Sequence, residues 1–92
     1  MIGYVRCECS LFNIHSLKEK RSVVKSVITK IKQRLNVSIA EIDDNDNWHR
    51  ATIGIAAVSN SQKKAEQELQ KALKMLESHY QIEVMKMEFE WL

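Results

Sequence analysis

The feature that most constrains this chain is a repeated change in the spacing of its apolar residues. From Ile2 to Phe12 apolar and polar residues alternate, a period of two that is typical of a strand with one buried face. In the segment 17–34 apolar residues instead recur every three or four positions, as they do in a helix with one buried side. Because one element cannot satisfy both periods, the change marks a boundary between a strand and a helix.

The first helix has a specific start signal. Ser16 is followed three residues later by Glu19, the pattern of a capping box. In that arrangement the Ser16 hydroxyl accepts from the N–H of Glu19, and the Glu19 carboxylate accepts from the N–H of Ser16. The helix is therefore predicted to begin at Leu17, and its apolar stripe ends near Arg34.

The middle of the chain predicts a β-hairpin. Two segments rich in β-branched residues, 37–43 and 48–58, flank the turn-forming run 44–47. If that run is the whole loop, Glu41 lies opposite Arg50 as a cross-strand pair of opposite charges. The same register places one set of residues under the helices: Ala40, Ile42, Ala51, Ile53, Ile55 and Ala57. It places another set on the opposite face: Val37, Ile39, Glu41, Trp48, Arg50 and Thr52.

The rest of the chain predicts a second helix and a fourth strand. Helical spacing runs from Ser61 to Ser78, and the segment 82–92 alternates again. In that strand one side is predicted to carry Met85, Met87, Phe89 and Trp91, and the other Val84, Lys86, Glu88 and Glu90. The order βαββαβ predicts an α+β, ferredoxin-like fold: a four-stranded antiparallel sheet, in the order 4-1-3-2, with two helices on one face. A chain of 92 residues has room for one such domain, residues 1–92.

The composition indicates a compact protein that does not enter a membrane. Hydrophobic residues make up 45% of the chain, but no apolar run approaches the ~20 residues of a membrane span. The N-terminal residues do not resemble a signal peptide. Cys7 and Cys9 lie on the same face of the first strand and are expected to be free, buried thiols. These features predict a reducing, cytoplasmic location.

The patterns that accompany catalysis or metal binding are missing from the sequence. His15, His49 and His79 lack metal-ligand spacing, and the acidic run 43–47 does not continue as a calcium loop. The chain has no nucleophile elbow and no glycine-rich phosphate loop. We therefore expect no catalytic residue, metal or cofactor. The open alternative is acid and base chemistry by Glu41, His49 and Arg50.

The charge distribution is the most informative feature for function. Seven of the fourteen Lys and Arg residues lie in the first helix, where only Glu19 opposes them. A basic helix in a chain of net charge +2 predicts a surface for nucleic-acid phosphates or another anion. The simpler explanation is a solvated outer helix face. The candidate RNA-binding or anion-binding residues are Lys18, Lys20, Arg21, Lys25, Lys32 and Arg34.

The sheet face opposite the helices predicts self-association. Its apolar residues would form an uncovered patch, and such patches usually mark interfaces. Base stacking on this face is the weaker interpretation, because the paired aromatics of RNA-recognition domains are missing. We expect a homodimer through this face or a sheet edge. The candidate interface residues are Tyr4, Arg6, Ile39, Trp48 and Arg50.

Three segments resemble the bacterial YlxP-like family, also called domain of unknown function 503: His15 to Arg21, Asn36 to Asp43, and Trp48 to Ser59. One departure is His49, where the family pattern has Gln. The resemblance implies a ferredoxin-like domain without an assigned biochemical function. It also implies a setting in translation or ribosome maturation, because family members are often encoded near such genes, including that for ribosome-binding factor A. Ribosomal RNA or a ribosomal subunit is therefore the expected partner.

Overall fold

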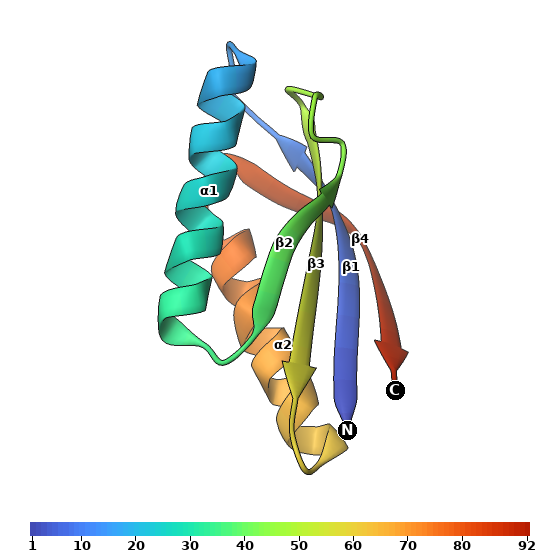
Figure 1. The fold of residues 1–92 in the computed structure, drawn as a ribbon. Helices are drawn as coiled ribbons and strands as arrows, with labels where there is room; N and C mark the ends of the chain where they lie inside the picture. The colour runs from blue at the N-terminus through green and yellow to red at the C-terminus, as the bar shows by residue number, and fades with distance from the viewer.

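The computed structural model describes all residues from Met1 to Leu92 and confirms the predicted order of elements (Figure 1). Three elements of the first half are β1 (Ile2–Leu11), α1 (Leu17–Arg34) and β2 (Ser38–Asp43). The second half consists of β3 (Arg50–Val58), α2 (Gln62–Glu77) and β4 (Ile82–Trp91).

The four strands form one antiparallel sheet in the order β2-β3-β1-β4, which confirms the ferredoxin-like α+β fold. Both helices lie on the same face, because each β-α-β crossover returns over that face with the same hand (Figure 1). The second helix packs across β1, β3 and β4, whereas α1 packs against β2 and α2. The two long edges of the sheet, β2 and β4, therefore have different surroundings.

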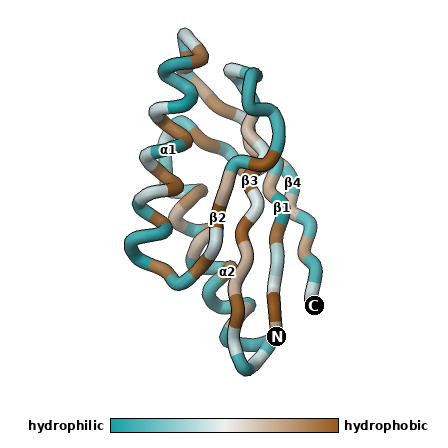
Figure 2. The backbone as a smooth tube through the Cα atoms, in the orientation of Figure 1, coloured by the Kyte–Doolittle hydropathy of each residue, from teal (hydrophilic) through white to brown (hydrophobic).

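The core lies between the sheet and the two helices. Apolar and polar residues alternate along the strands (Figure 2). The apolar residues of β1 and β3 that point toward the helices belong to the buried core. Cys7 and Cys9 are fully buried and free, as predicted. Burial raises the pKa of the Cys7 thiol to about 12, and the neighbouring charges of Cys9 and Glu77 act in the same direction. Burial, together with the charge of Glu77, raises the pKa of Cys9 to about 11.

The predicted register of the hairpin is wrong. The strands pair Ile39 with Ile55 and Glu41 with Ile53, and the pairing is irregular between Glu41 and Asp43. The third strand also begins at Arg50, so the connection is longer than the predicted loop. The resulting shift is an odd number of residues, and it exchanges the two faces of β2 because side chains alternate along a strand.

This exchange of faces corrects several predictions. Ile39 is only 3% exposed and belongs to the core, so it is not an interface residue. Ile42, predicted to lie under the helices, is 46% exposed on the sheet face opposite the helices, which we call the open face. Glu41 lies on the helix side, and the predicted pair with Arg50 does not form. Arg50 instead lies opposite Ser10 on β1.

The last strand also contains an irregularity that the sequence pattern does not show. Lys86 pairs with Glu8, but the next residue of β1, Cys9, pairs with Val84. Met85 is thus the extra residue of a β-bulge. Directly opposed residues share a face, so Val84 lies on the helix side and not beside Lys86 as predicted.

Candidate nucleic-acid interface

The start of α1 agrees with the predicted capping box. Ser16 is the extended N-cap residue, and its Oγ accepts from the N–H of Glu19 at 3.0 Å. The Glu19 carboxylate accepts from the N–H of His15 at 3.1 Å, one residue before the predicted donor, Ser16. Two N–H groups near the helix end are thereby satisfied, and the helix begins at Leu17 as expected.

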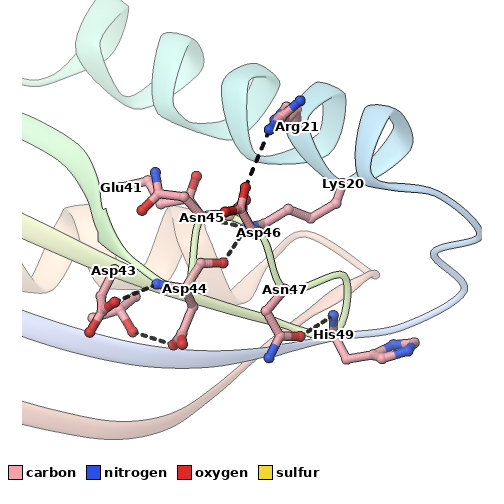
Figure 3. A network of polar contacts seen from close by, with 10 residues as sticks. Lys20, Arg21, Glu41, Asp43, Asp44, Asn45, Asp46, Asn47 and His49 are labelled. Carbon is pink, nitrogen blue, oxygen red and sulfur yellow. Dashed lines mark hydrogen bonds and ion pairs between the residues drawn. The ribbon is translucent and has the colours of Figure 1, made fainter.

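Lys20, predicted to contact RNA, is fully buried. Its Nζ donates to Glu41 Oε2 at 2.5 Å, to the carbonyl oxygen of Asp44 at 2.8 Å and to that of Asn45 at 3.3 Å (Figure 3). An ammonium has three protons to donate, and here each has an acceptor. Lys20 therefore ties α1 to β2 and to the hairpin loop, and the prediction that it contacts RNA is wrong.

A signal for the burial of Lys20 was present in the sequence. Lys20 precedes Val24 by four residues, Val27 by seven and Ile31 by eleven, so all four lie on one side of the helix. Those three apolar residues form the buried stripe of α1. A lysine in phase with a buried stripe needs an acid beneath it, and Glu41 on β2 supplies that acid.

The hairpin loop is organised around Asp44. This residue has a φ of 63°, in the left-handed region that Asp and Asn tolerate better than most residues. Its Oδ2 accepts from Thr52 Oγ1 at 2.8 Å, and its carbonyl oxygen accepts from the N–H of Asn47 at 3.0 Å. A second contact joins the loop to α1: Arg21 Nη2 lies 3.5 Å from Asp46 Oδ1 (Figure 3). Both side chains of that ion pair are exposed, so it is the weaker tie.

Four exposed cations remain on one side of α1, and we call them the basic stripe: Lys18, Arg21, Lys25 and Lys32. Lys18, Lys25 and Lys32 recur every seven residues, a spacing that drifts by only ~20° around a helix. Arg21 precedes Lys25 by one turn and lies in the same sector. The stripe extends along about 21 Å of the helix.

Arg34 is exposed but separate from the basic stripe. It follows Lys32 by two residues, which turns it about 200° around the helix axis. It stands in the last turn of α1, where a cation is favoured by the helix dipole. The presence of Arg34 is therefore explained by the helix end alone.

A shallow groove runs between the basic stripe and β2. Arg21, Lys25 and Lys32 line it from the helix, and Glu41 lines it from the strand. The Glu41 carboxylate is already engaged by Lys20, so it does not pair with the cations of the stripe. Lys18, Lys25 and Lys32 form no ion pair in the structure.

The second helix provides an internal comparison. The sequence of α1 contains seven basic residues and one acidic residue, whereas that of α2 contains four basic and three acidic residues. Lys71 on α2 pairs with Glu68 at 3.6 Å. Strong positive charge is therefore a property of one helix and not of the helical layer as a whole.

Three of the remaining candidate interface residues, Tyr4, Arg6 and Arg50, stand on the side of the sheet away from the helices. Arg6 contacts Glu8 at 3.1 Å and Asp43 at 3.9 Å, and Arg50 contacts Glu8 at 3.8 Å. Tyr4 lies beside Gly54, where it leaves little room for a side chain. Trp48 is 44% exposed in the loop before β3, not in the strand as predicted. The structure therefore places ion pairs beside the apolar patch that the sequence predicted on this face.

Glu41, His49 and Arg50, the alternative acid and base candidates, do not converge. Glu41 points to the helix side and binds Lys20, whereas Arg50 points to the open side and approaches Glu8. His49 is exposed in the loop between the strands. No three His, Cys, Asp or Glu side chains are grouped as metal ligands would be. Neither helix combines the length and the apolarity required to span a bilayer.

The fold and this surface define a ferredoxin-like α+β domain with one strongly basic helix. The family model for a protein of unknown function, DUF503, matches residues 2–89. The chain is also 45% identical over 91 residues to the uncharacterized protein YlxP of Bacillus subtilis (strain 168), with 99% of each chain covered. The chain therefore belongs to the YlxP-like DUF503 family, as its sequence motifs indicated.

Proposed function

We propose that this protein is a non-enzymatic binding protein that contacts structured RNA, free or in a ribosomal particle, through the basic stripe on α1. The observation that carries the proposal is the set of exposed lysines, Lys18, Lys25 and Lys32, which share one side of the helix and have no acidic partner. Cations that no acid neutralises are available to phosphates.

The structure narrows the surface that the sequence suggested. Lys20 is not part of the proposed binding surface, because it is buried. Arg34 is not part of it either, because it lies on another side of the helix. Arg21 remains, although it shares its charge with Asp46. A row of cations about 21 Å long fits a phosphate backbone better than a small anion, which would need convergent groups.

The setting implied by the family resemblance, translation and ribosome maturation, favours RNA among the possible polyanions. Contacts between lysines and phosphates position a protein on a duplex without reading its sequence. The basic stripe is therefore expected to recognise the shape and charge of a folded RNA, and the open sheet face is not required for this contact.

The test is co-sedimentation of the purified protein with ribosomal subunits and with free ribosomal RNA across a salt series. Four phosphate contacts predict that log K falls with log salt concentration with a slope of about 3 to 4. The variant Lys18→Glu, Lys25→Glu, Lys32→Glu is expected to lose binding at every salt concentration. Because these side chains are exposed and unpaired, the variant should retain the parent's circular dichroism spectrum and unfolding midpoint.

The matched control reverses three exposed lysines of α2: Lys63→Glu, Lys71→Glu and Lys74→Glu. Both triple variants change the net charge by the same amount, so a general charge effect would weaken them equally. The proposal requires that the α2 variant binds much better than the α1 variant. Equal binding by the parent and the α1 variant would show that the basic stripe only keeps the helix solvated.

The alternative predicted from the sequence, a homodimeric interaction module, remains a prediction. Its proposed location on the open face loses one member, because Ile39 is in the core. The exposed apolar residues of the structure include a group on β4, at the edge of the sheet. A self-association surface is therefore better sought along that strand.

A further inference from the structure

The outer edge of β4 carries unpaired backbone groups. Ile2 and Leu92 exchange two backbone hydrogen bonds, at 3.0 and 2.8 Å. Along an antiparallel pair, residues that exchange such bonds alternate with residues whose N–H and C=O point away from the partner strand. Trp91, Phe89 and Met87 fall in the second class, opposite Gly3, Val5 and Cys7. Their backbone groups therefore point to the free edge of the sheet.

The same stretch of β4 exposes large apolar side chains. Met85 is 57% exposed, Met87 45% and Phe89 38%. Met87 and Phe89 lie on the helix side, since they oppose Cys7 and Val5, but the helical layer leaves them partly uncovered. A long edge strand with exposed apolar side chains is a template for pairing with another chain.

We infer that β4 pairs antiparallel with β4 of a second copy of this chain, with Met87 at the two-fold axis. In this register Lys86 lies opposite Glu88 of the partner subunit, and Glu88 lies opposite the partner's Lys86. Within one chain these two side chains already meet at 3.3 Å, so both are on the same face. On the other face Met87 opposes its own copy, and Met85 opposes the partner's Phe89.

The charges of β4 favour this register over its neighbours. An axis at Met85 would oppose Lys86 to the partner's Val84 and would form no pair of opposite charge. An axis at Lys86 or at Glu88 would place that residue opposite its own copy, and an axis at Phe89 would oppose Glu88 to the partner's Glu90. Like charges directly opposite each other destabilise a sheet. The register centred on Met87 instead forms two pairs of opposite charge and one continuous apolar strip. This self-complementarity argues for a second copy of the same chain as the occupant.

The resulting dimer would contain one sheet with the strand order β2-β3-β1-β4-β4-β1-β3-β2. Antiparallel pairing of the two β4 strands keeps both helical layers on the same face. Each α1 lies by β2, so the two basic stripes would occupy the outer ends of that face. The inference does not depend on RNA binding, although such a dimer would present both stripes to one large partner.

The first test compares two exposed apolar residues in sedimentation equilibrium. The parent is expected to dimerise at high micromolar concentration. Met87→Lys is expected to be monomeric, because it places two ammonium groups at the axis. Ile42→Lys is the matched control: Ile42 is 46% exposed, like Met87, but lies on the open face. This variant is expected to dimerise as the parent does, and circular dichroism checks that both variants are folded.

The second test fixes the register by charge exchange. Lys86→Glu alone and Glu88→Lys alone each oppose like charges across the axis, and each should raise the dimer dissociation constant by about tenfold. The double variant Lys86→Glu, Glu88→Lys restores opposite charges and should return the constant close to the parent's value. Recovery in the double variant supports pairing centred on Met87, and failure of the double variant to recover refutes that register.

Two results would overturn the inference. A parent protein that remains monomeric at high micromolar concentration would show that β4 does not pair with its own copy. A dimer that is lost in Ile42→Lys but kept in Met87→Lys would place self-association on the open face of the sheet.

Discussion

The two edge strands of the sheet have different surroundings. The edge strand β2 is six residues long, is packed against α1, and is fixed at one end by Lys20. The opposite edge strand, β4, is ten residues long and presents exposed methionines and a phenylalanine. No strand of the chain lies beyond either β2 or β4.

The difference is that buried polar contacts gather at one edge of the sheet and exposed apolar side chains at the other. At the hairpin end of β2 a buried ammonium, a carboxylate and two carbonyl groups of the following loop satisfy one another. At β4 backbone groups and apolar side chains are left to water or to another chain. The basic stripe lies on the helix beside β2, and the proposed dimer contact lies along β4.

The largest expected effect is at the hairpin end of β2. Lys20→Met leaves the Glu41 carboxylate, whose side chain is only 14% exposed, without its cation. We expect a loss of about 3 kcal/mol in the free energy of unfolding, measured by urea denaturation. The double variant Lys20→Met, Glu41→Leu removes both charges and should recover most of that loss.

The control for this prediction is Lys18→Met, an exposed lysine of the same helix. Its free energy of unfolding should stay within about 0.5 kcal/mol of the parent's. If Lys20→Met were as stable as this control, the buried contacts of Lys20 would not stabilise the packing of α1 on β2.

The next largest effect is expected where β1 meets β4. A Cβ at Gly3 would stand 2.5 Å from Trp91 Cζ3 and 3.0 Å from Leu69 Cδ1. Gly3→Ala therefore forces the Trp91 ring outward and should cost about 2 kcal/mol. The change should also shift the tryptophan fluorescence of the folded protein, because Trp91 becomes more exposed.

Gly54→Ala is the matched control on the open face. Its Cβ would approach Tyr4 Cε1 at 3.2 Å and Ile42 Cδ1 at 3.3 Å, where both side chains can move toward solvent. We expect a change below about 1 kcal/mol in unfolding free energy. A larger loss in Gly54→Ala than in Gly3→Ala would mean that the open face is packed more tightly than the region around Trp91.

An intermediate effect is expected from the buried thiols between the two edges. The ordinary thiol pKa is 9.0, whereas the folded protein raises that of Cys7 to about 12 and that of Cys9 to about 11. Above pH 9.0 the unfolded chain loses these protons while the folded chain keeps them. Stability should therefore fall as pH rises from 9.0 toward 11, because the folded chain retains protons that the unfolded chain has lost.

Urea midpoints measured from pH 8 to pH 10 check this prediction about the thiols. The control is the double variant Cys7→Ala, Cys9→Ala, whose midpoint should fall less over the same range. Parallel pH profiles for the parent and this variant would contradict the raised pKa values.

The smallest effect is expected from the exposed tie between α1 and the loop. Arg21→Ala removes an ion pair whose side chains are 62% and 90% exposed. Its free energy of unfolding should change by less than about 0.5 kcal/mol, and Asp46→Ala should give the same result. A loss comparable to that of Lys20→Met would place the anchor of the loop at Arg21 and not at Lys20.

Most of the fold could be predicted from the sequence, because local patterns determine local structure. Alternation predicted β1, the capping box predicted the start of α1 at Leu17, and the order of elements predicted the strand order. The faces of β2 were assigned wrongly. The loop before β3 is longer than its turn-forming residues indicate, and a bulge follows Glu41, so local propensity alone did not determine the register.

The candidate site, like the fold, was predictable from the sequence only in part. The sequence determined that α1 is basic, because seven basic residues and one acidic residue are a matter of composition. The tertiary structure decided which of those charges are available. Lys20 is buried because β2 brings Glu41 beneath it, a contact between residues 21 positions apart. A helical pattern predicts which side a lysine occupies, but only the packing of another element on that side decides whether the lysine meets water or an acid.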